Sequence, residues 1–142
     1  MIIESIREYY ESLKQKLQRL QDALEAVVNR MKDTASLIEG CTTAKTNIEN
    51  YVSDTLETAS QKCKKSATAN FEAYYMKNLN SILGGQSIAS ALDSIASIKS
   101  DASKKYLDDE EESKRLEGDI KNTNDEMNTV SLQMQNEEVE VN

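Results

Sequence analysis

The side chains that most often perform chemistry in proteins are missing from this sequence or lack the partners that they need. Histidine is absent from the 142 residues, which removes the commonest general base and metal ligand. Serine, cysteine and acidic residues are present, but no Ser/His/Asp or Cys/His set can be formed without histidine. The sequence therefore predicts a protein that is not an enzyme and that uses no cofactor or metal.

Three smaller groups of residues fit structural roles better than chemical ones. Asp108–Glu112 is a run of five acids, but it lacks the spaced ligands and the glycine of a calcium loop, so we expect a solvated helix face. Cys41 and Cys63 are too few for a disulfide scaffold, and we expect buried, reduced thiols. Gly84-Gly85 has neither GxGxxG spacing nor a following Lys-Ser/Thr, so it indicates a turn rather than a phosphate cradle.

The composition favours long helices. Proline and tryptophan are absent, and the chain has four glycines and one phenylalanine, so little interrupts a helix and a thick globular core is not expected. The length fits a single domain, residues 1–142. We therefore expect an all-α, elongated domain with coiled-coil packing.

A heptad pattern in the first 38 residues predicts helix pairing. Apolar residues recur every seven positions in two interleaved series, which together form the a and d positions, here called the seam. The first series is Ile3, Tyr10, Leu17, Leu24, Met31 and Ile38, and the second is Ile6, Leu13, Leu20 and Val27. A helix with this pattern buries one narrow face against another helix.

The same spacing continues along the chain and divides it into helical segments. We expect helices at about residues 2–38, 44–83 and 87–134, followed by a frayed acidic tail, 135–142. In the third segment Lys99, Asp109 and Ser113 occupy seam positions and weaken the packing there. At 1.5 Å per residue, segments on the order of 55–75 Å can fold back as an antiparallel hairpin or a three-segment bundle.

Glycines mark the expected breaks. Gly40, with Thr42 and Thr43 as N-caps, indicates either a turn or a kink at residues 39–43, and we favour a break. Gly84-Gly85 is the strongest breaker, since glycine readily takes the left-handed conformation that reverses the chain. Ser87 would then cap the next helix.

The charge is concentrated near the C-terminal end and excludes one class of partner. Residues 108–140 hold twelve Asp/Glu and three Lys/Arg, a balance of −9 within a net charge of −8. Binding to nucleic acid needs clustered Lys/Arg, so it is not expected. The start of the chain has no basic leader and no apolar stretch of membrane-spanning length. We expect cytoplasmic synthesis, no membrane insertion, and any secretion to use a route without a cleaved leader.

Residues 63–71 read Cys-Lys-Lys-Ser-Ala-Thr-Ala-Asn-Phe. This segment resembles one in the small, WXG-like helical proteins of bacterial type VII secretion. In that family Trp-x-Gly begins the second helix of a hairpin and a Phe follows on its inner face. Cys63 stands in the Trp position, Lys65 in the Gly position and Phe71 in the Phe position. The resemblance implies a hairpin turn near residues 62–65, whereas the local sequence favours Gly84-Gly85.

A second fragment, Tyr106-Leu107-Asp108-Asp109-Glu110, is similar to the Tyr/Phe-x-x-x-Asp/Glu export signal of the same system. Its spacing places Tyr106 and Glu110 on one helix face, one turn apart. Tyr106 is also an ordinary seam residue. In size, acidity and helical character the chain resembles the proteins that pair with the helical N-terminal region of LXG-type toxins.

The resemblance implies a helical adaptor, or targeting factor, that pairs with a secreted helical cargo. The contact residues would be the large apolar seam residues Leu13, Leu17, Leu20, Leu24, Val27, Leu116, Ile120, Met127, Val130 and Met134. The seam is narrower than the apolar face of a self-contained bundle, so we expect another helical chain, a paralogue or a second copy to cover it. Three alternatives stay open: seams satisfied within a monomer, a cytosolic chaperone of the flagellar or type III kind, and a structural homo-oligomeric coiled coil.

Overall fold

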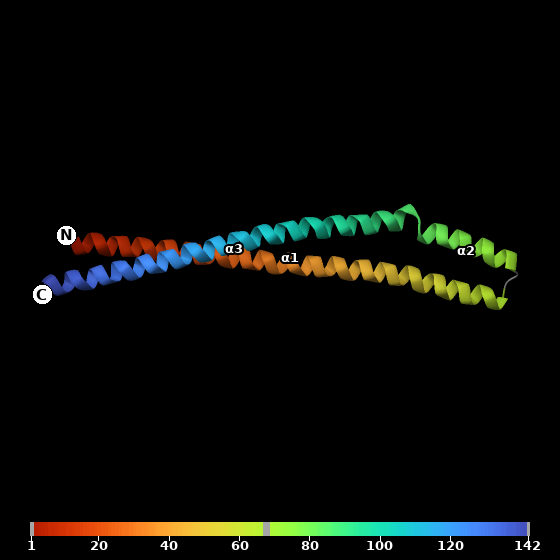
Figure 1. Ribbon diagram of the computed structural model, residues 1–142, viewed down its shortest axis with the longest axis horizontal. Coiled ribbons are helices and arrows are strands. Elements are labelled where there is room, and N and C mark those ends of the chain that lie inside the picture. Colours follow the sequence, from red (N-terminus) through yellow and green to blue (C-terminus); the bar gives the residue numbers. More distant parts are fainter. Residues whose placement is uncertain (1, 67–68, 142) are drawn as a thin grey trace. The chain divides into compact units, whose positions relative to one another are not determined.

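The computed structural model describes residues 2–66 and 69–141, with the side chains of residues 2–64 and 73–140. The described chain consists of α1 (Ile2–Ser66), α2 (Ala69–Leu83) and α3 (Gln86–Val141) (Figure 1). No described residue lies in a strand. The expected all-α class with helical-hairpin packing is confirmed. Lys65 and Phe71, on which the first resemblance rests, lie outside the described side chains.

The first helix is longer than the sequence suggested, and the expected break at residues 39–43 is wrong. α1 continues through this region to Ser66. The Thr42 hydroxyl, an expected N-cap, instead donates to the carbonyl oxygen of Ile38 one turn earlier in the same helix, at 3.2 Å. A single glycine costs a helix about 1 kcal/mol. Because the seam continues through the buried Cys41, packing outweighs this cost.

α1 ends at Ser66 and α2 begins at Ala69, so the expected continuous segment 44–83 is wrong as well. Tyr75 of α2 lies beside the stretch of α1 from Tyr51 to Lys62. The start of α3, at Ile88 to Leu92, lies beside the earlier residues 48–56 of α1. Both α2 and α3 therefore run antiparallel to α1, as the direction of the ribbon shows (Figure 1).

Gly84-Gly85 interrupts the returning helix without reversing it. Neither glycine has a positive φ, so the expected left-handed reversal is wrong. The backbone is crowded here, since a Cβ at Gly84 would lie 3.0 Å from the carbonyl oxygen of Asn80, and one at Gly85 2.9 Å from that of Ser81. These carbonyl oxygens leave little room for a Cβ, so the junction favours glycine at both positions.

The ends of α3 also differ from the expected ones. α3 begins at Gln86, so Ser87 lies within its first turn and is not the N-cap. The helix continues to Val141, beyond the expected end at Met134. The acidic tail is therefore helical through Val141, and Asn142 lies outside the described residues.

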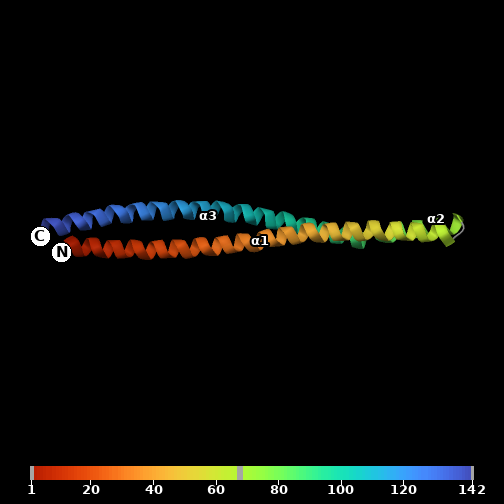
Figure 2. The same cartoon turned by 90° about the horizontal axis from the view of Figure 1, so that it is seen from below.

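The packed chain groups into two compact units. Unit 1 comprises Met1–Asp33 and Lys105–Asn142, and unit 2 comprises Thr34–Lys104. In unit 1 the start of α1 lies along the end of α3 in both views (Figure 1 and Figure 2). Arg7 pairs with Glu138, whereas Arg30 pairs with Glu112, so the two stretches are antiparallel.

Each unit has a thin core built from the seam. In unit 1 the fully covered apolar residues are Leu13, Val27, Leu116 and Val130. In unit 2 they are Cys41, Cys63, Leu83 and Ala102. The expectation that both cysteines are buried and free is confirmed. They lie 22 residues apart on one helix, about 33 Å, so they cannot bond to each other.

Candidate functional site

The ten seam residues expected to bind a partner lie in unit 1, where the rows from α1 and α3 face each other. Four of them are buried inside the chain: Leu13, Val27, Leu116 and Val130. The other six are half-buried: Leu17, Leu20, Leu24, Ile120, Met127 and Met134. The hairpin therefore uses the seam for its own packing. The six half-buried residues keep apolar surface that a further helix could cover.

The half-buried state follows from the number of helices in the unit. Two paired helices cover each other's seam from one direction only, and both flanks of the seam remain open. A bundle of four helices covers the same side chains from two directions. Unit 1 thus has the geometry of half a bundle.

Cross-helix polar contacts close the two flanks in part. On one flank, here called the Arg30 flank, the Tyr9 hydroxyl donates to Glu126 and Arg30 pairs with Glu112 at 3.3 Å. On the other flank, Arg7 pairs with Glu138 at 3.1 Å. Positions beside an a/d seam commonly carry such pairs, which select partner and orientation. These pairs fit an antiparallel register.

The hydrogen bond from Tyr9 changes the acidity of its phenol. The Glu126 carboxylate accepts the phenolic hydrogen bond, and its negative charge disfavours tyrosinate. Together with desolvation, these effects raise the pKa of Tyr9 above its ordinary value of 10.0. Tyr9 therefore stays protonated, and able to donate, at neutral pH.

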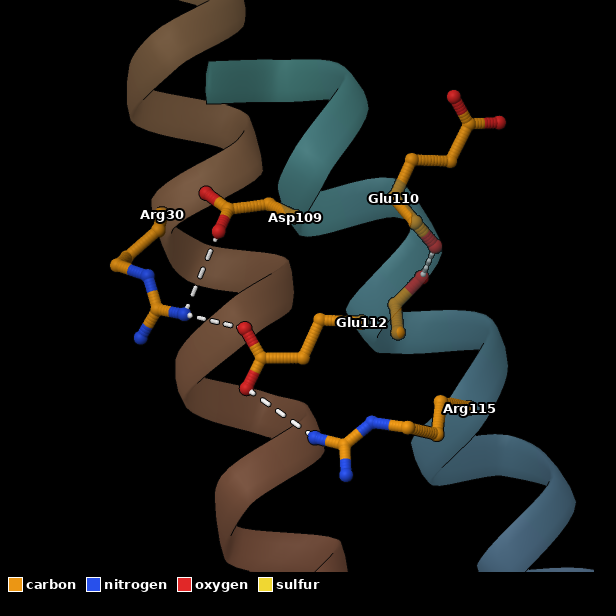
Figure 3. Close-up of polar contacts among 6 residues, drawn as sticks. Arg30, Asp109, Glu110, Glu112 and Arg115 are labelled. Carbon is orange, nitrogen blue, oxygen red and sulfur yellow. Dashed lines mark hydrogen bonds and ion pairs between the residues drawn. The ribbon is translucent and has the colours of Figure 1, made fainter. Parts of the chain in front are cut away.

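One acidic residue is buried within the seam of unit 1. Asp109 is 5 % exposed, and one of its carboxylate oxygens lies 3.4 Å from the Arg30 guanidinium. Figure 3 shows Arg30 between Asp109 and Glu112, with Arg115 on the far side of Glu112. The second oxygen of Asp109, Oδ2, is buried without a hydrogen-bond partner among the described residues. A buried carboxylate with one unsatisfied oxygen weakens packing at this level, as the seam pattern predicted.

Two other polar seam residues, Ser113 and Thr123, form hydrogen bonds within α3. The Ser113 hydroxyl donates to the carbonyl oxygen of Glu110, and that of Thr123 to Asp119, both at 2.8 Å. Burial of these two hydroxyls therefore costs little free energy.

Sequence reasoning missed Arg30 because its role depends on the register between α1 and α3. An isolated basic residue opposite an acidic run is the signal that could have found it.

The candidate export signal lies on α3 in unit 1. Tyr106 and Glu110 are both half-buried. Glu110 pairs with Lys114 at 3.7 Å, and its carboxylate points away from α1 (Figure 3). A receptor could therefore reach Glu110, while part of Tyr106 belongs to the seam.

Unit 2 contains an apolar pocket that the sequence did not indicate. The pocket has a volume of about 430 Å³ and opens where α2 ends and α3 begins. Its apolar lining comes mainly from Ile48, Val52, Leu56, Leu83, Ile88 and Leu92. The break at Gly84-Gly85 interrupts the row of side chains facing α1, and this gap forms the pocket.

The two units differ in charge. Unit 1 contains 18 Asp/Glu and 10 Lys/Arg, whereas unit 2 contains seven of each. The entire net charge of −8 therefore belongs to unit 1. A partner of unit 1 meets a negative field, and a partner of unit 2 does not.

Two searches of the described residues concern other kinds of site. No group of three or more metal-ligating side chains lies close enough to hold an ion in the described part of the chain. None of the described helices combines the length and apolar character needed to cross a membrane. Comparison with known protein families, curated proteins and solved structures found no match.

Proposed function

We propose that the chain is a non-enzymatic helical adaptor that pairs with the helical N-terminal region of a secreted cargo, an LXG-type toxin, for type VII secretion. The observation that carries the proposal is the incompletely covered seam of unit 1, with its six half-buried apolar residues. Surface of this kind is covered best by the apolar stripe of another helix. The sequence resemblance supplies the class of cargo.

The energetics allow such a contact. Full burial of a large aliphatic side chain contributes about 1.5–3 kcal/mol, and these six side chains are already half-buried. Completing their burial would contribute on the order of 1 kcal/mol each. The total is in the range of moderate protein affinity once the cost of association is subtracted.

The negative charge of unit 1 affects which partner helices can bind. An incoming helix lies beside a unit with a net charge of −8. Lys or Arg beside the partner's apolar stripe would speed association and favour the correct orientation. We therefore expect the cargo helix to be amphipathic, with basic flanks.

The contact is tested by substitution on the seam. Leu17→Asp with Leu24→Asp places two carboxylates on half-buried positions, and co-purification with a co-expressed toxin N-terminal region should be lost. Gln15→Asp with Asn29→Asp is the matched control, since both residues are exposed on α1. If the Leu variant loses its helical circular dichroism, Met127→Gln with Met134→Gln replaces it. Retention of the cargo by the folded seam variant contradicts the assignment.

Export is tested separately. In the proposed role, Glu110→Gln should abolish release of the chain into the culture supernatant and leave cargo binding intact. Glu111→Gln, an exposed neighbour, should have no effect. A chain that stays in the cytosol while its cargo leaves would instead indicate a chaperone of the flagellar or type III kind.

A further inference from the structure

The heptad pattern of unit 1 does not by itself fix how α3 is aligned along α1. Seam residues recur every seven positions on both helices, so sliding one helix by a heptad brings seam positions against seam positions again. Such a shift moves α3 by about 10 Å along α1. The sequence near the end of α1 at Ser66 has neither glycine nor proline, so it does not select an alignment either. A contact that exists in one alignment alone is needed to select it.

The buried contact between Asp109 and Arg30 has this property. Asp109 occupies a seam position of α3, is 5 % exposed, and has one carboxylate oxygen 3.4 Å from the Arg30 guanidinium (Figure 3). After a shift of one heptad, the place of Arg30 is taken by Ala23 or by Leu37, which lie seven positions before and after it. Neither side chain carries a charge. Because a buried carboxylate that loses its cation is costly, both shifted alignments are disfavoured.

The other polar contacts of the seam discriminate less between alignments. The Tyr9 hydroxyl donates to Glu126, and the residues seven positions from Glu126 are Asp119 and Gln133, whose side chains also accept hydrogen bonds. The Thr123 hydroxyl donates to a carbonyl oxygen of its own helix, so a shift leaves this bond intact. These contacts therefore contribute less to the choice of alignment.

We propose that the contact between Arg30 and Asp109 determines the register of unit 1, by selecting one alignment among those that the heptad pattern permits. A polar residue at a seam position specifies register in this way at a cost in stability. The pair of Arg7 with Glu138 is more than half exposed on both sides and contributes little. The six half-buried residues that the proposed function offers to a cargo helix take no part, so the inference is independent of that function.

The distance between two spin labels on the purified chain, measured by pulsed electron paramagnetic resonance, reports the register. Ser5→Cys on α1 and Asn122→Cys on α3 provide labelling sites at exposed positions of unit 1. Cys41 and Cys63 are buried, and the chain without new cysteines serves as the blank. The labelled chain should show a single distance.

Arg30→Leu with Asp109→Leu removes the contact and makes this level of the seam apolar, so the helices still pair. Circular dichroism confirms that the variant is helical. Two further distances should appear, shorter and longer by about 10 Å along the helix axis. Thr123→Val, which removes a buried hydroxyl that bonds within α3, is the matched control and should keep the single distance. A single unchanged distance in the Leu variant, or equal redistribution in the control, overturns the proposal.

A second variant moves the cation instead of removing it. Ala23→Arg with Arg30→Leu places the guanidinium one heptad earlier on α1, so the alignment with Asp109 beside residue 23 should become the preferred one. In that alignment the two labels lie closer by about 10 Å along the axis. Ala26→Arg with Arg30→Leu, at an exposed position of the same helix, should show no preference for the shorter distance. The same distances in both variants would also contradict the proposal.

Discussion

At the residue scale, the contact between Arg30 and Asp109 joins α1 to α3 at a buried position of unit 1. Replacing a buried ion pair by apolar residues often leaves stability unchanged or raises it, whereas removal of one partner leaves a charge without compensation. The pattern of the sequence placed Asp109 on the seam. It could not reveal Arg30, because the partner across the seam depends on how α1 and α3 align.

Arg30→Met should lower the free energy of unfolding by about 1–3 kcal/mol, since it leaves the buried Asp109 carboxylate without its cation. Asp109→Leu should leave this free energy unchanged or raise it, because it removes the carboxylate with the unsatisfied Oδ2. Thermal unfolding followed by circular dichroism measures both. Arg19→Met, at an exposed position of the same helix, is the control, and an equal loss for Arg19 and Arg30 would refute the assignment.

Tyr9 gives a pH-dependent contribution to the pairing in unit 1. Its pKa is raised in the folded chain, so the contribution is fully present below the unfolded value near 10 and is lost as the pH rises through the folded pKa. Glu126→Gln should move the pKa of Tyr9 back toward 10. A tyrosinate absorbance titration, with Tyr9→Phe to identify the signal, checks this. An unchanged titration in Glu126→Gln would contradict the bond.

At the element scale, the heptad pattern was a better guide to helices than the glycines were. It gave the buried and half-buried positions of α1 and α3. Gly40 suggested a break because glycine is a weak helix former, but the seam holds the helix together across it. The end of α1 at Ser66 was missed because the sequence near it has neither glycine nor proline to mark it.

Replacement of Gly40 and of Gly85 by alanine should change the free energy of unfolding in opposite directions. Gly40→Ala should raise the free energy of unfolding by about 0.5–1 kcal/mol, since nothing lies within 4 Å of the added Cβ. Gly85→Ala should lower it by about 1–3 kcal/mol, because the Cβ would lie 2.9 Å from a backbone oxygen. Urea unfolding of the two variants distinguishes them. Stabilisation by Gly85→Ala would show that the junction is not crowded.

At the scale of the whole molecule, charge is distributed unequally between the two units. The sequence gave the acidic stretch at residues 108–140. The division became visible only when the fold placed residues 1–33 with residues 105–142 and left residues 34–104 neutral. In the proposed role, the charge of unit 1 favours a basic cargo helix.

Hydrogen–deuterium exchange tests most directly whether a partner helix covers the seam of unit 1. The chain would be measured alone and in complex with a co-expressed toxin N-terminal region. We predict that the complex slows exchange in the seam stretches 13–27 and 116–134 and leaves the stretch 37–51 unchanged. Unchanged exchange in both seam stretches, or slowing confined to residues 37–51, would contradict the account.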